Sequence, residues 1–488
     1  MNCTLIKRRA KIIATIGPAT QGPDKIHDLL LAGVDVIRLN FSHGNLDDHE
    51  DRIVMIREIA TKMNRSVSIL QDLQGPKLRL GKLPVDGFLM PQGKQIFLSS
   101  HDPFFMGSSE AIPCLPLDIP EVEKFVQIGD RVLLDDGYFE LVVNEIINRK
   151  ILTTVITGGL VTSHKGVNLP DSDINIPTFT EKDKTDLIFG LNHDVDIVAL
   201  SFIQSAVDIK NVRNFIEENM PSRVGVPIIA KLERPVAMEN LEEIMDEADG
   251  VMIARGDLAV ETSPYYVPIA QKKIIAMAND KAKIVITATQ MLESMIHHPR
   301  PTRAEASDVA NAILDGSDAV MLSGETAVGK YPIKTVQMMH AIIQEAEQNY
   351  DSWGHHSNTR FTKVHSDSLS MAKAAYTLSN ALDVAGIAVF TQSGRTAILM
   401  SKMRPHCPIV AFTPNQDTYQ RLHLIWGVIP YKIPFADTAE KMVYEVENAV
   451  LSLTPLEKGQ QLVMVATFPI GKTGKPNFML LHTIGNPI

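Results

Sequence analysis

The chain has 488 residues, of which 45% are hydrophobic and 21% charged, and it carries a formal net charge of −10. A chain of this length exceeds what one hydrophobic core supports, so we expect about three domains of roughly 150 residues each. The composition is that of a soluble globular protein. The net negative charge excludes a nucleic-acid partner held by bulk electrostatics, and an acidic substrate would need local positive groups.

Three cysteines, Cys3, Cys114 and Cys407, lie far apart and follow no CxxC spacing. This pattern indicates a reducing compartment rather than a disulfide framework or a zinc site. The basic residues 7–11 are not followed by the apolar segment of a signal peptide, and we find no uncharged apolar run long enough to span a bilayer. We therefore expect a cytoplasmic protein with no membrane partner.

Short apolar, β-branched runs recur along the chain, and most are followed by a helical pattern such as residues 24–32, 208–218 or 302–314. Near-continuous apolar strands that alternate with helices are typical of a parallel sheet with a covered outer face. Eight such units predict a (β/α)8 TIM barrel. The predicted strands are residues 11–17, 34–40, 67–72, 196–202, 227–233, 250–257, 283–290 and 318–325.

The third unit is interrupted, because residues 75–174 separate its strand from the helix that should follow. This insert is rich in Gly, Pro and short strand patterns, of which residues 131–143 and 150–159 are the clearest. It predicts a small inserted β-barrel domain on a βα loop, at the barrel end that carries catalytic residues. A mobile lid is a natural use for such a domain.

The turn-rich residues 350–360 predict a linker after the eighth unit. Beyond them, helical patterns at 369–382 and 439–453 accompany five apolar strand patterns, which predicts a separate open α/β domain. We therefore expect a catalytic barrel, an inserted lid and a C-terminal regulatory domain. The expected boundaries are 1–74 with 175–350 for the barrel, 75–174 for the lid and 351–488 for the regulatory domain.

Polar and charged residues end several of the predicted barrel strands. In the second strand Arg38, Asn40 and Ser42 stand at every second position, so their side chains share one face. They cluster at the C-terminal end, whereas a solvated face would spread its polar residues along the strand. Because parallel barrel strands all end at one rim, we predict a site there. The other strand-end residues are Asp72, Lys231, Glu233, Arg255, Gly256, Asp257 and Thr289.

Lys231 and Glu233 share a strand face, and a structural ion pair explains their spacing as well as a catalytic role does. Glu233 and Asp257, however, offer two carboxylates from adjacent strands, which suits Mg²⁺ with water and phosphate in its remaining positions. Lys231 and Arg38 would then face the anion. Gly256 allows close approach of an anion to the backbone, although a plain turn explains this glycine equally well.

A series of motifs resembles pyruvate kinases in content and order. The resemblance runs from about residue 7 through the C-terminal domain. It implies transfer of the phosphoryl group of phosphoenolpyruvate to ADP in glycolysis, by an allosteric enzyme that forms a homotetramer. The motifs are TIGPAT (15–20), RLNFSHG (38–44), DLQGPKLRLG (72–81), KGVNLP (165–170), IIAKLE (228–233), MIARGDL (252–258), ATQMLESM (288–295), the long block 300–332 and TQSGRTA (391–397).

The resemblance implies a role for each strand-end residue. Arg38 would contact the transferring phosphoryl group, and Lys231 would stabilise charge on that group and on the enolate oxygen. Glu233 and Asp257 would bind Mg²⁺ or Mn²⁺. Thr289 would help to relay the proton that converts enolate into pyruvate. The implied contacts of the substrate carboxylate are Gly256, Asp257 and Thr289; those of the nucleotide are Asn40, His43, Arg79 and Lys165; those of a monovalent cation are Asn40, Ser42, Asp72 and the Leu73 carbonyl.

One departure from the family pattern concerns the cation site. Many relatives read DTKGPE where this chain reads DLQGPK, so that Lys77 replaces a glutamate. This resembles the subset of the family that works without potassium, because an ammonium near the cation site can supply the charge that K⁺ otherwise brings. We therefore expect activity that does not require K⁺. The alternative is that Lys77 points into solvent.

The segment 391–396 places hydroxyls and amides at a predicted helix N-terminus, which favours phosphate binding. It is similar to the loop that binds a phosphorylated effector in the family, with Thr391, Ser393, Gly394, Arg395 and Thr396 as the implied contacts. The later GKT at 471–473 lacks the leading Gly of a nucleotide P-loop, which is Ala466 here. We interpret Lys472 and Lys475 instead as candidates for a second effector phosphate.

Two other functions fit parts of the pattern. A metal-dependent barrel lyase or aldolase acting on pyruvate or phosphoenolpyruvate would also use rim carboxylates and a cation, but it would not need the nucleotide-matching Arg79 and Lys165. A non-catalytic phosphometabolite sensor would not need all four of these residues intact: Lys231, Glu233, Asp257 and Thr289.

Overall fold

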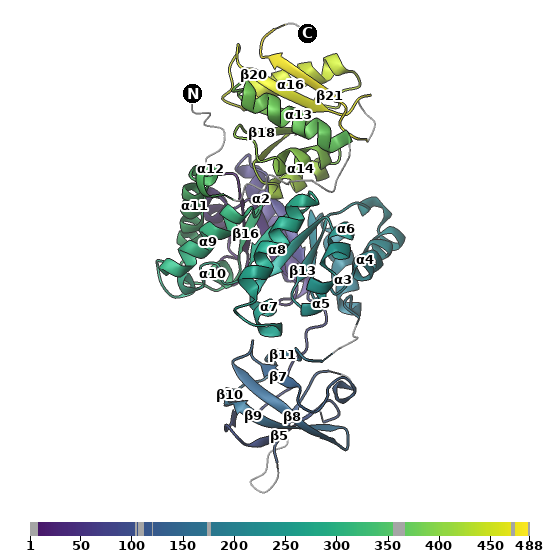
Figure 1. Ribbon diagram of the computed structural model, residues 1–488, viewed down its shortest axis with the longest axis vertical. Helices are drawn as coiled ribbons and strands as arrows, with labels where there is room; N and C mark the ends of the chain where they lie inside the picture. Colours follow the sequence, from purple (N-terminus) through teal and green to yellow (C-terminus); the bar gives the residue numbers. More distant parts are fainter. Residues whose placement is uncertain are drawn as a thin grey trace.

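The computed structural model describes residues 8–102, 105, 112–119, 121–172, 177–354, 367–469 and 474–486. Figure 1 shows three parts stacked along the long axis, with the insert at one end, the barrel in the middle and the C-terminal domain at the other end. Among the described residues, none of the helices combines the length and the apolar character that crossing a bilayer requires. Of the described cysteines, Cys114 is buried and Cys407 is half-buried, and neither forms a disulfide; Cys3 lies outside the described residues.

Eight parallel strands close into a barrel, which confirms the predicted fold. Neighbouring strands keep a regular register; for example, Arg38 is opposite Leu70, and Lys231 is opposite Met252. The strands are almost wholly buried, as near-continuous apolar runs require. In barrel order they are β1 (Lys11–Thr15), β16 (Ala319–Leu322), β15 (Ile284–Ala288), β14 (Gly250–Ala254), β13 (Ile228–Leu232), β12 (Ile197–Leu200), β3 (Ser68–Asp72) and β2 (Val36–Asn40).

Helices cover the outside of the barrel, and their ends follow local sequence signals. Thr302 caps α9 through a capping box with Glu305, and Gly316 ends that helix with a φ of 107°, which favours glycine. The helical patterns at 24–32, 208–218 and 302–314 correspond to α1, α4 and α9. The helices are α1 (Pro23–Ala32), α2 (Leu46–Lys62), α3 (Glu181–Asn192), α4 (Ala206–Asn219), α5 (Pro235–Glu239), α6 (Leu241–Glu247), α7 (Arg255–Glu261), α8 (Val267–Asp280), α9 (Arg303–Asp315), α10 (Gly324–Ala327), α11 (Pro332–Gln348) and α12 (Tyr350–Trp353).

The insert between β3 and α3 is all-β with its own hydrophobic core, in which Leu98, Leu115, Val132 and Leu141 are fully buried. Its described strands form a six-stranded sheet in the order β11-β7-β8-β9-β5-β6 and a two-stranded sheet of β10 and β4. The strands are β4 (Phe88–Met90), β5 (Gln95–Ser99), β6 (Cys114–Pro116), β7 (Arg131–Leu134), β8 (Phe139–Ile147), β9 (Lys150–Thr157), β10 (Gly159–Val161) and β11 (Val167–Asn168).

The C-terminal domain is an open α/β sheet in the order β19-β18-β17-β20-β21, in which only β21 is antiparallel among the strands described. This agrees with the predicted open α/β fold. Residues 350–353 of the predicted linker form α12, and residues 355–360 lie outside the described residues. The elements are α13 (Asp367–Ala381), β17 (Gly386–Phe390), α14 (Arg395–Lys402), β18 (Ile409–Thr413), α15 (Gln416–Arg421), β19 (Val428–Lys432), α16 (Ala439–Leu453), β20 (Gln461–Ala466) and β21 (Phe478–Thr483).

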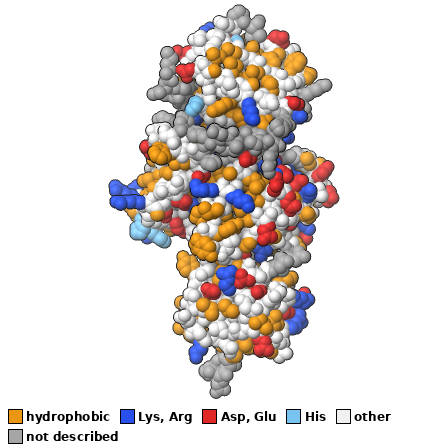
Figure 2. Space-filling model, viewed as in Figure 1, with side chains coloured by type: hydrophobic (Ala, Val, Ile, Leu, Met, Phe, Trp, Pro, Cys, Tyr) orange, Lys and Arg blue, Asp and Glu red, His pale blue; other side chains and the backbone are white. Residues whose placement is uncertain are grey.

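Charge is unevenly distributed over the surface. On the face shown in Figure 2, acidic side chains gather on the side of the barrel where Figure 1 places α4 and α6, whereas Lys and Arg occur in small groups. On this face, positive charge for an anionic ligand would therefore come from individual side chains rather than from a broad basic surface.

A buried ion cluster joins the barrel to the C-terminal domain. Asp318, immediately before β16, pairs with Lys402 at the end of α14 and with Arg404, whose Nη2 lies 2.8 Å from the carboxylate. The Asp318 carboxylate also accepts a hydrogen bond from the Val285 amide at 2.8 Å. Arg404 stacks over Trp426 at 4.1 Å. All three charges are almost fully buried, so each depends on its partners.

We expect Asp318→Asn to lower the free energy of unfolding by about 3–5 kcal/mol, because two buried cations lose their counter-charge. Chemical denaturation followed by tryptophan emission measures this, since Trp426 is buried whereas Trp353 is exposed. The control is Asp171→Asn, which breaks the more exposed Arg131–Asp171 pair and should cost about 1 kcal/mol or less. Equal losses in the two variants would contradict the assigned role of the cluster.

Candidate active site

The predicted site lies at the C-terminal rim of the barrel strands, on the side that faces the insert (Figure 1). A cleft between barrel and insert opens onto this rim, and one side chain crosses it directly: Asn168 of β11 donates to Glu261 of α7 at 2.6 Å. The residues that line the cleft are Pro76, Lys77, Leu78, Asp136, Gly166, Val167, Asn168, Leu169, Phe202, Gln204, Arg234, Asp257 and Glu261.

Four charged side chains form a continuous chain of ion pairs at the rim, which we call the rim chain: Arg38, Asp72, Lys231 and Glu233. The Nε and Nη2 atoms of Arg38 each lie 2.7 Å from Asp72 Oδ2. The Nζ atom of Lys231 lies 3.2 Å from Asp72 and 3.0 Å from Glu233. Asp72 and Glu233 are each 1% exposed, so the charges compensate one another in a region of low dielectric constant.

These contacts fix the protonation states within the rim chain. Burial opposes ionisation of Asp72, but Lys231 and Arg38 outweigh it and hold the pKa of its carboxyl below the usual range. Burial likewise opposes the charge of Lys231, but Asp72 and Glu233 outweigh it and raise the pKa of that ammonium. Lys231 is therefore a permanently charged donor at the rim rather than a base.

Two hydroxyl residues complete the rim chain, and sequence reasoning did not identify them. Lys231 donates to Ser201 Oγ at 2.7 Å, and Ser201 donates to the Leu73 carbonyl at 2.6 Å. Arg38 Nη1 donates to Thr15 Oγ1 at 3.0 Å. The available signal was position, since Thr15 ends β1 and Ser201 follows β12 at the same rim. Hydroxyl residues are so frequent at strand and helix ends that their type alone indicates nothing.

Glu233 of the rim chain lies close to Asp257, which lines the cleft between barrel and insert. Burial raises the pKa of both carboxyls; Asp257 raises the pKa of Glu233 further, while Asp136 and Glu261 act in the same direction on Asp257. A divalent cation would relieve this repulsion, so the pair fits such an ion. The described residues contain no group of three or more His, Cys, Asp or Glu side chains arranged to hold a metal. The pair would therefore leave coordination positions for water and ligand oxygens.

Gly256 and Thr289, which follow the neighbouring strands β14 and β15, are joined by a hydrogen bond. The Gly256 amide donates to Thr289 Oγ1 at 2.8 Å, and this hydroxyl donates to the Ala288 carbonyl at 2.7 Å. The amide expected to contact an anion is thus already bonded to the hydroxyl expected beside it. Thr289 and Gln290 both have left-handed backbones, with φ of 65° and 52°. Such conformations cost about 1–3 kcal/mol each and persist only where the surroundings impose them.

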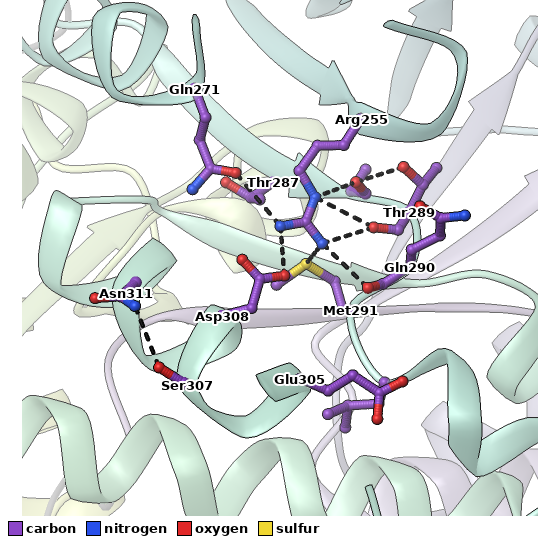
Figure 3. Close-up of polar contacts among 12 residues, drawn as sticks. Arg255, Gln271, Thr287, Thr289, Gln290, Met291, Glu305, Ser307, Asp308 and Asn311 are labelled. Carbon is purple, nitrogen blue, oxygen red and sulfur yellow. Dashed lines mark hydrogen bonds and ion pairs between the residues drawn. The ribbon is translucent and has the colours of Figure 1, made fainter. Parts of the chain in front are cut away.

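Arg255 differs from its expected place among the strand-end residues. Its side chain turns away from the rim chain, toward the loop after β15 and toward Asp308 of α9 (Figure 3). The reason is that α7 begins at Arg255 itself. The strand rule, by which successive side chains point to opposite faces, therefore no longer applies at this residue.

Two of the residues expected to bind nucleotide, His43 and Arg79, lie close to Lys77 and to Arg38 of the rim chain. Partial burial together with Arg79, Lys77 and Arg38 lowers the pKa of His43, which places these cations near one imidazole. Arg79 also donates to the His164 carbonyl at 3.0 Å. Lys77 additionally lies close enough to Asp257 to lower its pKa, so Lys77 faces the cleft and not only solvent. The lowered pKa favours a neutral His43. The positive potential of this part of the rim therefore comes from Arg79, Lys77 and Arg38.

The remaining predicted contacts lie at the C-terminal ends of β2 and β3 and on the loop that follows β10. Lys165 of the insert pairs with Asp135 at 2.9 Å. The Asn40 side-chain oxygen accepts from the Ser42 amide at 3.1 Å, which orients the two residues toward each other. The Leu73 side chain is buried, so only its carbonyl is available, and Ser201 already donates to that oxygen.

The predicted effector loop precedes α14. Gly394 is the N-cap, with a φ of 83°, and its amide donates to Thr391 Oγ1 at 3.0 Å. Ser393 and Arg395 are exposed, whereas Thr391 and Thr396 are buried. The loop thus presents exposed polar groups at a helix N-terminus. Of the second candidate pair, Lys472 lies outside the described residues, and Lys475 lies 3.5 Å from Asp367.

Comparison with known proteins covers nearly the whole chain. A family described as "Pyruvate kinase, barrel domain" matches residues 7–336, and one described as "Pyruvate kinase, alpha/beta domain" matches residues 370–482. A pyruvate kinase of Geobacillus stearothermophilus is 40% identical over 486 residues, which are 99% of this chain and 81% of the relative. A pyruvate kinase of Corynebacterium glutamicum is 41% identical over 481 residues, which are 98% of each chain.

The architecture has a similar counterpart among solved structures. The crystal structure of a pyruvate kinase from Cryptosporidium parvum matches with a TM-score of 0.89 at 33% sequence identity, and the match covers 98% of this chain and 96% of that one.

We expect the affinity for Mg²⁺ to rise with pH through the raised pKa values of Glu233 and Asp257, because protons compete with the cation for these carboxylates. Isothermal titration with Mg²⁺ alone, between about pH 5 and about pH 7.5, measures this. Asp257→Asn should abolish the binding, whereas Asp194→Asn, at an exposed carboxylate, should leave it unchanged. Binding that is independent of pH, or that survives Asp257→Asn, would contradict the assignment.

Proposed function

The chain belongs to the pyruvate kinase family, and from this premise we propose that it transfers the phosphoryl group of phosphoenolpyruvate to ADP, which gives pyruvate and ATP. The family makes it a phosphotransferase. The observation that carries the proposal is the rim chain, in which two largely buried cations and two buried carboxylates lie within contact distance at the mouth that faces the insert.

Lys231 and Arg38 are the proposed catalytic cations. A phosphoryl group in flight carries negative charge on its equatorial oxygens, and the enolate oxygen gains charge as the bond to phosphorus breaks. A unit charge about 4 Å away contributes about 4 kcal/mol at an effective dielectric constant near 20. Because Asp72, Ser201 and Thr15 fix both cations beforehand, little reorganisation is needed during the reaction.

Glu233 and Asp257 are the proposed ligands of Mg²⁺ or Mn²⁺. When bound, such an ion neutralises phosphate oxygens and orients them. The Glu233 carboxylate is held in place for metal binding, because its Oε2 accepts from the Phe202 amide at 2.6 Å while Oε1 faces Lys231. Glu261 and Asn168 extend the acidic side of the cleft toward the insert.

Gly256, Asp257 and Thr289 are proposed to hold the substrate carboxylate. The Gly256 amide and the Thr289 hydroxyl already face each other, so a carboxylate oxygen can share their hydrogen bond. Thr289 is further proposed to help deliver the proton that converts enolate into pyruvate. To do so the hydroxyl turns its O–H from the Ala288 carbonyl toward the enolate carbon and takes a replacement proton from water.

The nucleotide is proposed to bind between the rim and the insert. The clustering of Arg79, Lys77 and Arg38 around His43 supports phosphate binding there. Asn40 completes the barrel side and Lys165 the insert side. Closure of the insert over Mg²⁺–nucleotide would exclude water from the transfer.

We further propose that the enzyme works without K⁺. The cation site of the family corresponds to Asn40, Ser42, Asp72 and the Leu73 carbonyl. Lys77 lies within electrostatic reach of His43, the neighbour of Ser42, and of Asp257, which supports a lysine ammonium as the substitute charge.

Regulation and assembly are proposed from the family resemblance. A phosphorylated small molecule would bind the loop 391–396 through Thr391, Ser393, Gly394, Arg395 and Thr396. The enzyme would be a cytoplasmic, glycolytic homotetramer. Each protomer would consist of a barrel (1–74 and 175–350), a lid (75–174) and a regulatory domain (351–488).

The first test of this function is Lys231→Met. We expect pyruvate formation from phosphoenolpyruvate and ADP to fall at least about 10³-fold, because the transition state loses a charge that no other residue supplies, while phosphoenolpyruvate still binds. A coupled assay and equilibrium binding measure the two effects. The control is Lys283→Met, at the opposite end of the barrel, whose ammonium bonds the Ala248 carbonyl at 2.7 Å. Equal activity in both variants would contradict the assignment.

The second test concerns K⁺. We expect the wild-type rate to be the same in buffers with and without K⁺, with Na⁺ absent from both, and Lys77→Glu to make the rate depend on K⁺, because a carboxylate there recreates the pattern of the relatives. Steady-state assays at matched ionic strength measure this. Lys82→Glu, on the insert, controls for the change in net charge. A wild-type rate that collapses without K⁺ would refute the proposal.

A further inference from the structure

The Arg255 guanidinium connects the ends of two neighbouring barrel strands (Figure 3). Its Nε donates to the Ala288 carbonyl at 3.2 Å, and its Nη2 donates to the Thr289 carbonyl at 2.8 Å and to the Gln290 carbonyl at 3.2 Å. Three successive carbonyls, at the end of β15 and in the loop that follows it, therefore converge on one side chain from the start of α7.

This convergence accounts for the left-handed backbone of Thr289 and Gln290. The carbonyls of these two residues both point to the guanidinium, and a β-branched residue such as Thr289 rarely adopts a positive φ unaided. A planar guanidinium presents several N–H donors in one rigid plane and can bond all three carbonyls at once. A lysine ammonium in its place could bond only some of them.

The same contacts close a ring around the substrate-binding groups. Arg255 precedes Gly256 in the chain, the Gly256 amide donates to Thr289 Oγ1, and the Thr289 carbonyl accepts from Arg255. The Thr289 backbone, which carries this hydroxyl, is therefore held relative to Gly256 by the guanidinium contacts. Asp308 Oδ2, 2.6 Å from Nη1, neutralises the charge of Arg255 and orients its fork.

We propose that Arg255 is a positioning residue, which sets the direction of the Thr289 hydroxyl and the Gly256 amide toward the substrate carboxylate and the enolate carbon. The proposal rests on the function proposed above. Arg255 acts through geometry rather than charge, because its positive charge is compensated by Asp308 and directed away from the rim chain.

Arg57 of α2 provides a matched control. It also donates to two backbone carbonyls, those of Val67 at 2.8 Å and Asp194 at 2.9 Å, and to one carboxylate, Asp196, at 2.7 Å. It does so at the N-terminal end of the barrel, far from Thr289. A purely structural role for such an arginine would give Arg57→Lys and Arg255→Lys the same consequences.

The experiment compares Arg255→Lys with Arg57→Lys in the full chain. We expect Arg255→Lys to lower kcat/KM for phosphoenolpyruvate about 10- to 100-fold while KM for ADP changes by less than about twofold. The exchange of pyruvate methyl hydrogens with D₂O, in which C3 loses a proton to give the enolate and regains a deuteron, should slow by a similar factor. Arg57→Lys should lower the unfolding temperature comparably and leave both rates within about twofold of wild type.

Two further variants separate the possible results. In a Thr289→Ala background, Arg255→Lys should lower kcat/KM little further, because the two residues act as one unit. If Arg255→Lys does not fold, Asp308→Asn, which loosens the fork, should show the same selective loss at about 3- to 10-fold. Unchanged kcat/KM and exchange in these variants, or effects of Arg255→Lys and Thr289→Ala that multiply, would overturn the positioning role. A wild-type chain that forms no pyruvate would instead overturn the proposed function, and this inference with it.

Discussion

The site depends on one electrostatic constraint: Lys231 must stay charged although only 12% of its side chain is exposed. It does so because Asp72 and Glu233 lie on either side of its ammonium, and Asp72 is in turn held by Arg38. These residues come from three different strands, so only a closed barrel of correct register brings them together. The fold therefore does more than support the site, since closure of the barrel supplies the partners that offset the cost of burying these charges.

The strand-end pattern allowed much of this to be predicted from the sequence. Period-two spacing placed Arg38 and Asn40 on one face, and parallel strands necessarily end at the same rim, so the convergence of Lys231 and Glu233 with Asp72 follows from the topology. The barrel, the all-β insert and the C-terminal sheet were likewise predictable from apolar runs and their spacing. The motif resemblance then added chemical roles that spacing alone does not assign.

Other features depended on contacts that local patterns do not encode. Arg255 was expected at the rim, but a helix begins there and turns its side chain outward to the carbonyls after β15. Ser201 and Thr15 have residue types too common at strand ends to be distinctive. The pairing of Asp318 with Lys402 joins segments 84 residues apart, and no periodicity predicts which buried carboxylate meets which lysine. In each case the partner lies on another element.

The most direct measurement of the central claim is ³¹P NMR of the wild-type chain with phosphoenolpyruvate, ADP and Mg²⁺. We expect phosphoenolpyruvate to be lost and ATP gained in equal amounts, and neither to change when ADP is left out, because the charged rim transfers the phosphoryl group only to a bound nucleotide. Loss of phosphoenolpyruvate without formation of ATP, or no change in either, would contradict this claim.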